Sequence, residues 1–120
     1  MSRSRHETGF TMIEVMIALL LTSIAIIGIL ALYMTQTRAS SFSRHMTEAS
    51  VLASDGLERM RTMVIPVGGT ELDITEQAQA GGVFDRVSTA TANGIDWDMN
   101  VSVSWDEDGV TRTVLVYGRR

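Results

Sequence analysis

An acidic residue inside an apolar segment is the first candidate for chemistry in this sequence. Glu14 lies in the stretch TGFTMIEVM (residues 8–16), and the 23 residues from Val15 to Thr37 that follow it carry no charge. A carboxylate at the centre of a membrane-spanning helix costs about 2.5–3.5 kcal/mol, and less near an end of the helix. Glu14 therefore either has a function inside the membrane or lies solvated at the headgroup boundary.

Other residues that could carry catalysis are few. The chain has no cysteine, which excludes disulfides, thiolate metal ligands and a cysteine nucleophile. His45 follows Arg44 in a segment with helical periodicity, where we expect the imidazole to face solvent. Ser40, Ser41 and Ser43 lie nearby without an aspartate at a suggestive spacing. We therefore expect no catalytic residue, no cofactor and no enzymatic activity.

The C-terminal half contains an acidic series with the spacing of a calcium loop. Asp96, Asp98, Asn100 and Glu107 fall at positions 1, 3, 5 and 12 of an EF-hand-like pattern. Position 6, where that loop needs glycine, is Val101. The alternating pattern of this segment predicts a strand, which would spread the first three residues over about 13 Å. We therefore expect no metal site here.

The apolar segment after Glu14 is long enough to cross a membrane. At about 1.5 Å per residue its helix would measure roughly 34 Å, against about 30 Å of hydrocarbon. A signal peptide cut near Ala39 fits poorly, because apolar cores of signal peptides run to about 7–15 residues. A signal anchor is possible, but Arg3 and Arg5 before the segment are balanced by Arg38 and Arg44 after it.

The residues around Glu14 resemble the N-terminus of type IV pilins and pseudopilins. In that family a short basic leader ends in glycine, phenylalanine usually follows, and a glutamate comes four residues later. Here the leader is Met1 to Gly9, and FTMIE runs from Phe10 to Glu14. The resemblance covers residues 9–32. It implies that prepilin peptidase cuts between Gly9 and Phe10 and methylates the new Phe10 amine, while the apolar helix is retained.

Cleavage at this bond would explain the carboxylate. The new Phe10 amine, with a reference pKa near 8, is mostly charged at neutral pH. Glu14 enters a low-dielectric helix bundle, where an unpaired charge is expensive. The Phe10 ammonium of a neighbouring subunit can compensate it only in the correct axial register, so the pair would select register. The resemblance gives the matching glutamate this role, which makes Glu14 the expected assembly residue.

A second segment indicates which sub-family the chain resembles most. LASDGLERMR (residues 52–61) resembles PilV-type minor pilins of type IV pili, with the GspI-type minor pseudopilin of type II secretion as the second choice. Many major pilins carry a proline inside the apolar half of the helix, whereas Pro66 is the first proline here. This difference favours a minor component. A signal-anchored periplasmic binding protein that does not polymerise is a further alternative.

The resemblance also implies partners and location. A minor pilin is a single-pass inner-membrane protein with a periplasmic head before assembly. Afterwards it lies in the fibre, near the tip, where it primes pilus assembly. Its partners would be other minor pilins and the major pilin through the N-terminal helix, prepilin peptidase, and inner-membrane lipid. The net charge of −4 and the lack of a basic cluster in the head argue against direct nucleic-acid binding.

The N-terminal half must be one long helix if these features are to work together. No proline interrupts residues 11–64, so we expect a helix from Thr11 to Val64. After Thr37 its pattern becomes amphipathic. The predicted apolar stripe consists of Phe42, Met46, Ala49, Ala53, Leu57, Met60 and Val64. The pairs Arg44–Glu48 and Asp55–Arg59 are spaced for ion pairs on the solvated side.

The C-terminal half predicts a small antiparallel sheet that covers this stripe. Residues 66–95 are glycine-rich and suggest loops, with a short element at 72–80 and a strand at 83–88. Residues 95–106 alternate strictly between apolar and polar, residues 106–109 (DEDG) predict a turn, and residues 110–117 return. We thus expect an α+β, pilin-like fold. Its regions would be leader 1–9, transmembrane and assembly helix 10–37, amphipathic helix 38–65, and loop plus sheet 66–120.

Overall fold

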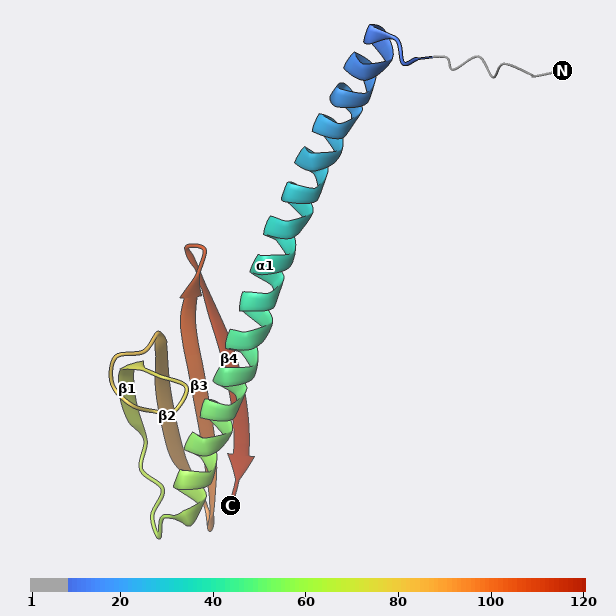
Figure 1. The fold of residues 1–120 in the computed structure, drawn as a ribbon. Coiled ribbons are helices and arrows are strands. Elements are labelled where there is room, and N and C mark those ends of the chain that lie inside the picture. The colour runs from blue at the N-terminus through green and yellow to red at the C-terminus, as the bar shows by residue number, and fades with distance from the viewer. Residues whose placement is uncertain (1–8) are drawn as a thin grey trace, which may run out of the picture. The chain divides into compact units, whose positions relative to one another are not determined.

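The computed structural model describes residues 9–120, so the predicted leader lies outside the described residues except for Gly9. One helix, α1 (Met12–Thr62), precedes four strands (Figure 1). These are β1 (Gly69–Ile74), β2 (Phe84–Asn93), β3 (Asp96–Glu107) and β4 (Val110–Arg119). This arrangement confirms the predicted α+β fold class. The chain divides into two compact units between Ala39 and Ser40, which are described separately below.

The first unit is the apolar part of α1. By length and composition this part could cross a membrane, and its large apolar side chains are all exposed. Four hydroxyls each donate a hydrogen bond to the backbone carbonyl four residues earlier, over 2.7–3.1 Å. They belong to Thr22, Ser23, Thr35 and Thr37. Internally satisfied hydroxyls allow a helix to lie in lipid without unpaired donors.

The second unit packs the remainder of α1 on one face of the sheet. The strands lie in the order β1-β2-β3-β4, and every neighbouring pair is antiparallel (Figure 1). The core contains residues of α1 and of the inner sheet face: Ala49, Leu52, Ala53, Leu57, Met60, Ile74, Phe84, Met99, Val101, Val103 and Trp105. From Met99 to Trp105, every second side chain of β3 is buried in this core, as the alternating sequence predicts.

The helical stripe is confirmed in its centre and wrong at one end. Ala49, Ala53, Leu57 and Met60 are buried as predicted, together with Leu52, which the prediction omitted. At the N-terminal end of the stripe, Phe42 and Met46 are only partly covered by the sheet, with 36% and 39% of their surface exposed. Val64 is 92% exposed because α1 ends at Thr62, two residues earlier than expected.

The end of α1 is held by the last strand of the sheet. Arg120 follows β4, and its Nη1 donates to the Arg61 carbonyl over 2.8 Å and also to the Met63 carbonyl. A cation at a helix C-terminus satisfies orphan carbonyls and complements the helix dipole. A contact between residues this far apart in sequence explains why local periodicity misplaced the end of the helix.

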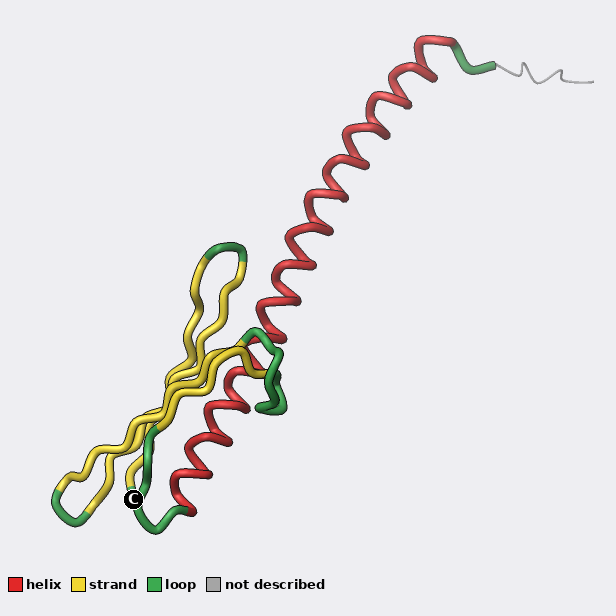
Figure 2. The backbone as a smooth tube through the Cα atoms, turned by 90° about the vertical axis from the view of Figure 1, so that its left-hand side faces the viewer, coloured by secondary structure: helices red, strands yellow, loops and turns green. Residues whose placement is uncertain are grey.

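Two tight turns connect the longer strands, at opposite ends of the sheet (Figure 2). Asp108 and Gly109 have φ values of +53° and +76°, as a type I′ hairpin turn requires. The turn predicted at residues 106–109 is therefore shorter, because β3 continues through Glu107. Ile95 lies in the other turn and is 99% exposed, so its predicted place in the apolar face is wrong.

The middle of the chain is more regular than predicted. The strand predicted at 83–88 is confirmed as the first half of β2, which runs from 84 to 93. The element predicted at 72–80 is wrong, because β1 lies at residues 69–74. β2 pairs with β3 without interruption from Phe84↔Trp105 to Asn93↔Asp96. The Thr–Ala–Thr–Ala–Asn end of β2 has no strong apolar alternation of its own, so pairing with β3 determines its length.

Candidate functional site

The start of α1 is a capped helix terminus, which the sequence analysis missed. Thr11 precedes the first helical residue, and its Oγ1 accepts a hydrogen bond from the Glu14 backbone N–H over 3.3 Å. The Thr11 carbonyl accepts from the N–H groups of Glu14 and Val15 at 3.0 and 3.3 Å. Threonine at the N-cap with glutamate three residues later has the sequence of a capping box. The T-x-x-E pattern of residues 11–14, directly before an apolar run, could have predicted this cap from the sequence.

Phe10 and Val15 add a second local feature. They occupy the positions before the N-cap and at the fourth helical residue, where apolar side chains form a hydrophobic staple. Both line one shallow depression, together with Glu14, Ala18, Leu19 and Thr22. Phe10 remains 83% exposed. The stretch FTMIEV thus contains the local signals that begin a helix at Met12.

The three predicted site residues lie together at the start of the described chain, in the first unit. Gly9 and Phe10 are exposed and lie in non-helical backbone immediately before α1. Glu14 is exposed in the first turn, and its carboxylate makes no hydrogen bond or ion pair within residues 9–120. The positive end of the helix dipole favours a carboxylate there by about 0.3–1 kcal/mol. This end of the chain can therefore present an accessible peptide bond next to an unpaired acid.

A second charged cluster lies in the second unit, residues 40–120, which we call the head, and its guanidinium is buried. The Arg86 side chain on β2 is 2% exposed. Its Nη1 donates to the Leu52 carbonyl over 3.1 Å and to Asp55 Oδ2 over 3.2 Å, and its Nε and Nη2 contact Glu71 on β1. Both carboxylates are 45% exposed. The guanidinium thereby joins α1, β1 and β2.

This cluster explains much of the LASDGLERMR segment. Leu52 and Asp55 receive Arg86, and Gly56 leaves room for its stem, because a Cβ at residue 56 would lie 3.2 Å from Arg86 Cδ. The predicted ion pairs also form: Arg44 Nε lies 3.5 Å from Glu48, and Arg59 Nε lies 2.9 Å from Asp55. The sequence analysis missed Arg86, although its spacing from Phe84 placed it on the inner sheet face.

His45 is not solvent-facing as predicted. Its side chain is 19% exposed and its ring lies edge-on to Phe84 and Trp105, with centroids 5.9 and 6.5 Å away. His45 Nδ1 is 3.6 Å from Glu107 Oε1, which is longer than a hydrogen bond. The aromatic pair on β2 and β3 covers the imidazole, and helical periodicity alone could not show this.

The acidic residues of the sheet are engaged in local contacts. Arg119 Nε and Asn93 Nδ2 each donate to Asp98 over 2.8 Å, and these hydrogen bonds, that from Arg119 first, hold the pKa of the Asp98 carboxyl below its usual 3.8. Glu107, the last residue of the EF-hand-like series, lies beside His45. Within residues 9–120 no group of three or more His, Asp or Glu side chains is placed to hold a metal ion.

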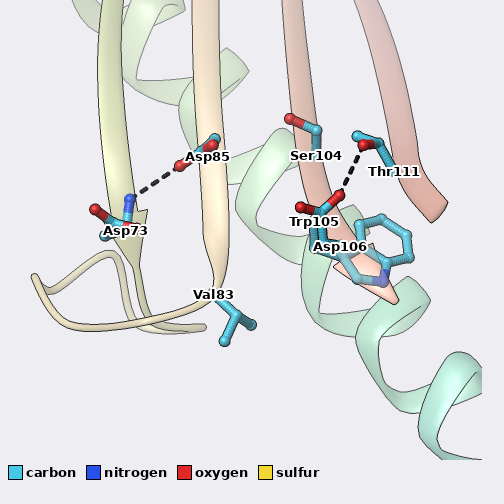
Figure 3. A pocket seen from close by; sticks show the side chains of 7 residues that line it. All are labelled: Asp73, Val83, Asp85, Ser104, Trp105, Asp106 and Thr111. Carbon is cyan, nitrogen blue, oxygen red and sulfur yellow. Dashed lines mark hydrogen bonds between the residues drawn. The ribbon is translucent and has the colours of Figure 1, made fainter. Parts of the chain in front are cut away.

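One further depression lies at the end of the sheet (Figure 3). Three aspartates line it, from β1, β2 and β3: Asp73, Asp85 and Asp106. Asp85 Oδ1 accepts the Asp73 backbone N–H over 3.0 Å, and Asp106 Oδ1 accepts the Thr111 hydroxyl over 2.7 Å. Two of the three carboxylates therefore hold the strands and the following turn, which gives the depression a structural role.

Comparison with known proteins bears on the N-terminal end alone. Residues 4–30 match the family model described as the prokaryotic N-terminal methylation motif. The matched range includes Gly9, Phe10 and Glu14 and ends inside α1. No curated protein and no solved structure matches the chain. The motif is that of a type IV pilin-like prepilin-peptidase substrate, and with the apolar helix it fits a membrane-anchored precursor.

Proposed function

We propose that this chain is a minor pilin of a type IV pilus. Prepilin peptidase cuts it between Gly9 and Phe10 and methylates the Phe10 amine, and the mature chain enters the fibre near its tip and primes assembly. The observation that carries the proposal is the methylation-motif match over residues 4–30. The non-helical, exposed backbone at Gly9 and Phe10 supports it, because a peptidase needs an accessible bond.

The apolar part of α1 supports a role in assembly. Its side chains find no partners within the described chain, so they must be covered by lipid and then by helices of neighbouring subunits. Other minor pilins and the major pilin are the proposed partners. The hydroxyls of Thr22, Ser23 and Thr35 donate to backbone carbonyls of the same helix. This surface can therefore pass from lipid to neighbouring helices without unpaired hydrogen-bond donors.

Glu14 is the proposed register residue. Its carboxylate is unpaired within residues 9–120, whereas the new Phe10 ammonium of a neighbouring subunit is a partner of opposite charge. The capping-box sequence offers a competing local explanation, since glutamine serves as well as glutamate at that position, although only the Thr11 half of the box is formed within residues 9–120. The two explanations differ in one respect, because only the register role requires the negative charge.

The choice among minor subunits rests on the LASDGLERMR segment, which supports a PilV-type minor pilin. The alternative is a minor pseudopilin of a type II secretion system, because the methylation motif fits both machines. Crosslinking from the stem of the chain in its own cells, followed by identification of the subunits bound, separates them. A signal-anchored periplasmic protein that never polymerises is the third possibility, and under it Glu14 is dispensable.

The first test is the mature N-terminus. Intact mass and N-terminal sequencing of the protein from cells with and without prepilin peptidase should show a chain that begins at methylated Phe10 only when the peptidase is present. An uncut Met1 start, or a cut near Ala39, would overturn the proposal.

The second test changes Glu14 while keeping the cap. We expect Glu14→Gln and Glu14→Ala to be processed normally but to enter the fibre at least about 100-fold less, because an unpaired buried charge at Phe10 costs about 3–5 kcal/mol. Glu14→Asp should retain part of the assembly. Co-purification with the other pilins, quantified per cell, gives the measurement. Normal assembly of Glu14→Gln would favour the capping role and reject the register pair.

A further inference from the structure

We propose that Thr11 is a positioning residue for cleavage of the Gly9–Phe10 bond. By capping α1, its hydroxyl keeps the first helical residue at Met12 and leaves the two residues of the bond in non-helical backbone. This inference rests on the proposed processing by prepilin peptidase. It assigns Thr11 to that step and leaves the charge of Glu14 to assembly.

The hydrogen bonds at the helix start show a direct competition. In a helix that began earlier, the Glu14 N–H would donate to the Phe10 carbonyl four residues back. Here that N–H is held by the Thr11 carbonyl at 3.0 Å and by Thr11 Oγ1 at 3.3 Å. The Thr11 carbonyl and hydroxyl thus share the donor that would otherwise draw Phe10 into the helix, and the hydroxyl is the acceptor that a substitution can remove.

Removing the hydroxyl should extend the helix toward the bond. The first N–H groups of a helix need acceptors, and beside an apolar segment water supplies few of them. Without Thr11 Oγ1, the carbonyl of Phe10 competes for the Glu14 N–H with the Thr11 carbonyl alone. A fraction of the molecules would then form further helical hydrogen bonds through Phe10 and Gly9.

Hydrolysis requires the bond to be outside the helix. Water adds to the Gly9 carbonyl carbon, the C–N bond to Phe10 breaks, Gly9 keeps the new carboxylate, and the Phe10 nitrogen takes a proton. A carbonyl bonded inside a helical turn is closed to such an attack. The range of the methylation-motif match contains both the bond and the cap.

The test uses the full chain in detergent with purified prepilin peptidase. We compare cleavage rates of the unchanged chain, Thr11→Ser and Thr11→Val, with Thr35→Val as the matched control. Thr35 also carries a back-bonded hydroxyl in α1 but lies far from the bond. Thr11→Ser and Thr35→Val should be cut at the normal rate. Thr11→Val should be cut about fivefold more slowly, since loss of an N-cap is worth about 1 kcal/mol.

A second measurement identifies the cause. In Thr11→Val, the NMR Cα shifts of Gly9 and Phe10 should move toward helical values. Cleavage of Thr11→Val at the rate of Thr11→Ser would overturn the inference. Slow cleavage without a helical shift would also overturn it, because Thr11 would then contact the peptidase directly. If the unchanged chain were not cut at Gly9–Phe10, the proposed function itself would fail.

Discussion

Two acidic sites of this molecule have opposite relations to the fold. In the head, Asp55 and Glu71 meet the buried guanidinium of Arg86, so the charges are matched inside the chain. In the apolar stem, Glu14 meets no cation within residues 9–120. The head also has a buried apolar core, whereas the large apolar side chains of the stem are all exposed.

The difference separates a charge cluster that is completed within the chain from groups that have no partner within residues 9–120. The first contributes to the stability of the chain that contains it. The exposed apolar surface and the acid of the stem are the features that the proposed assembly would use. Substitutions in the head should therefore change stability, whereas substitutions in the stem should change processing and assembly but not the stability of the head.

The largest effect is expected from removing both partners of Arg86. The double variant Asp55→Ala, Glu71→Ala leaves a guanidinium buried without compensation, which typically costs about 3–5 kcal/mol. Because both carboxylates are half-exposed, we expect about 2–3 kcal/mol. Thermal unfolding followed by the fluorescence of Trp97 and Trp105, the two tryptophans of the chain, reports on β3 and so on the head.

Two controls sharpen this result. Arg86→Met should cost less than the double variant, because the carboxylates it leaves behind can be solvated. Glu14→Ala should leave the unfolding of the head unchanged. If Glu14→Ala destabilised the head as much as the double variant did, the separation of the two regions would be wrong.

The next effect compares two glycines of the same helix. A Cβ at Gly56 would lie 3.2 Å from Arg86 and from Val101, whereas a Cβ at Gly28 would meet nothing within 4 Å. Gly56→Leu should therefore destabilise the head by about 1–3 kcal/mol through overpacking. Gly28→Leu should leave it unchanged. Equal melting temperatures of the two variants would show that the helix is not closely packed at Gly56.

The smallest effect concerns acid. Hydrogen bonds from Arg119 and Asn93 lower the pKa of the folded Asp98 carboxyl below 3.8, so the contact stabilises the fold above about pH 4. That stabilisation is lost as the pH falls through the lowered pKa. Asp98→Asn should make the melting temperature slightly less dependent on pH below 4. An identical acid profile of the variant and the unchanged chain would remove Asp98 from the pH response.

Much of the fold followed from local pattern. The apolar run predicted the exposed stem helix, and the six alternating pairs of residues 95–106 predicted β3 and its partner strand. The position of β2 was harder to predict, because its second half has no apolar face and is ordered by pairing with β3. Ile95 and Val64 looked like core residues in sequence but lie beyond the ends of their elements.

At the N-terminal site, the roles of the three residues named from sequence stay predictions. Gly9, Phe10 and Glu14 are neighbours along the chain, so their types and spacing alone indicate processing and assembly. The role of Thr11 was missed because the T-x-x-E pattern was not applied to the same segment. His45 was misplaced because its burial depends on Phe84 and Trp105, which lie more than thirty residues away in sequence.

By itself, then, the sequence determined the elements whose signals are local: the apolar stem, the motif at its start, and the alternation of β3. Tertiary structure alone decided which charges are satisfied. Arg86 bonds to Leu52 and Asp55, which lie 34 and 31 residues earlier in the sequence. Arg120, the residue after β4, caps the end of α1 by bonding to the Arg61 carbonyl, 59 residues earlier. Periodicity reports which face of an element is apolar, but only packing brings distant polar groups within hydrogen-bonding distance.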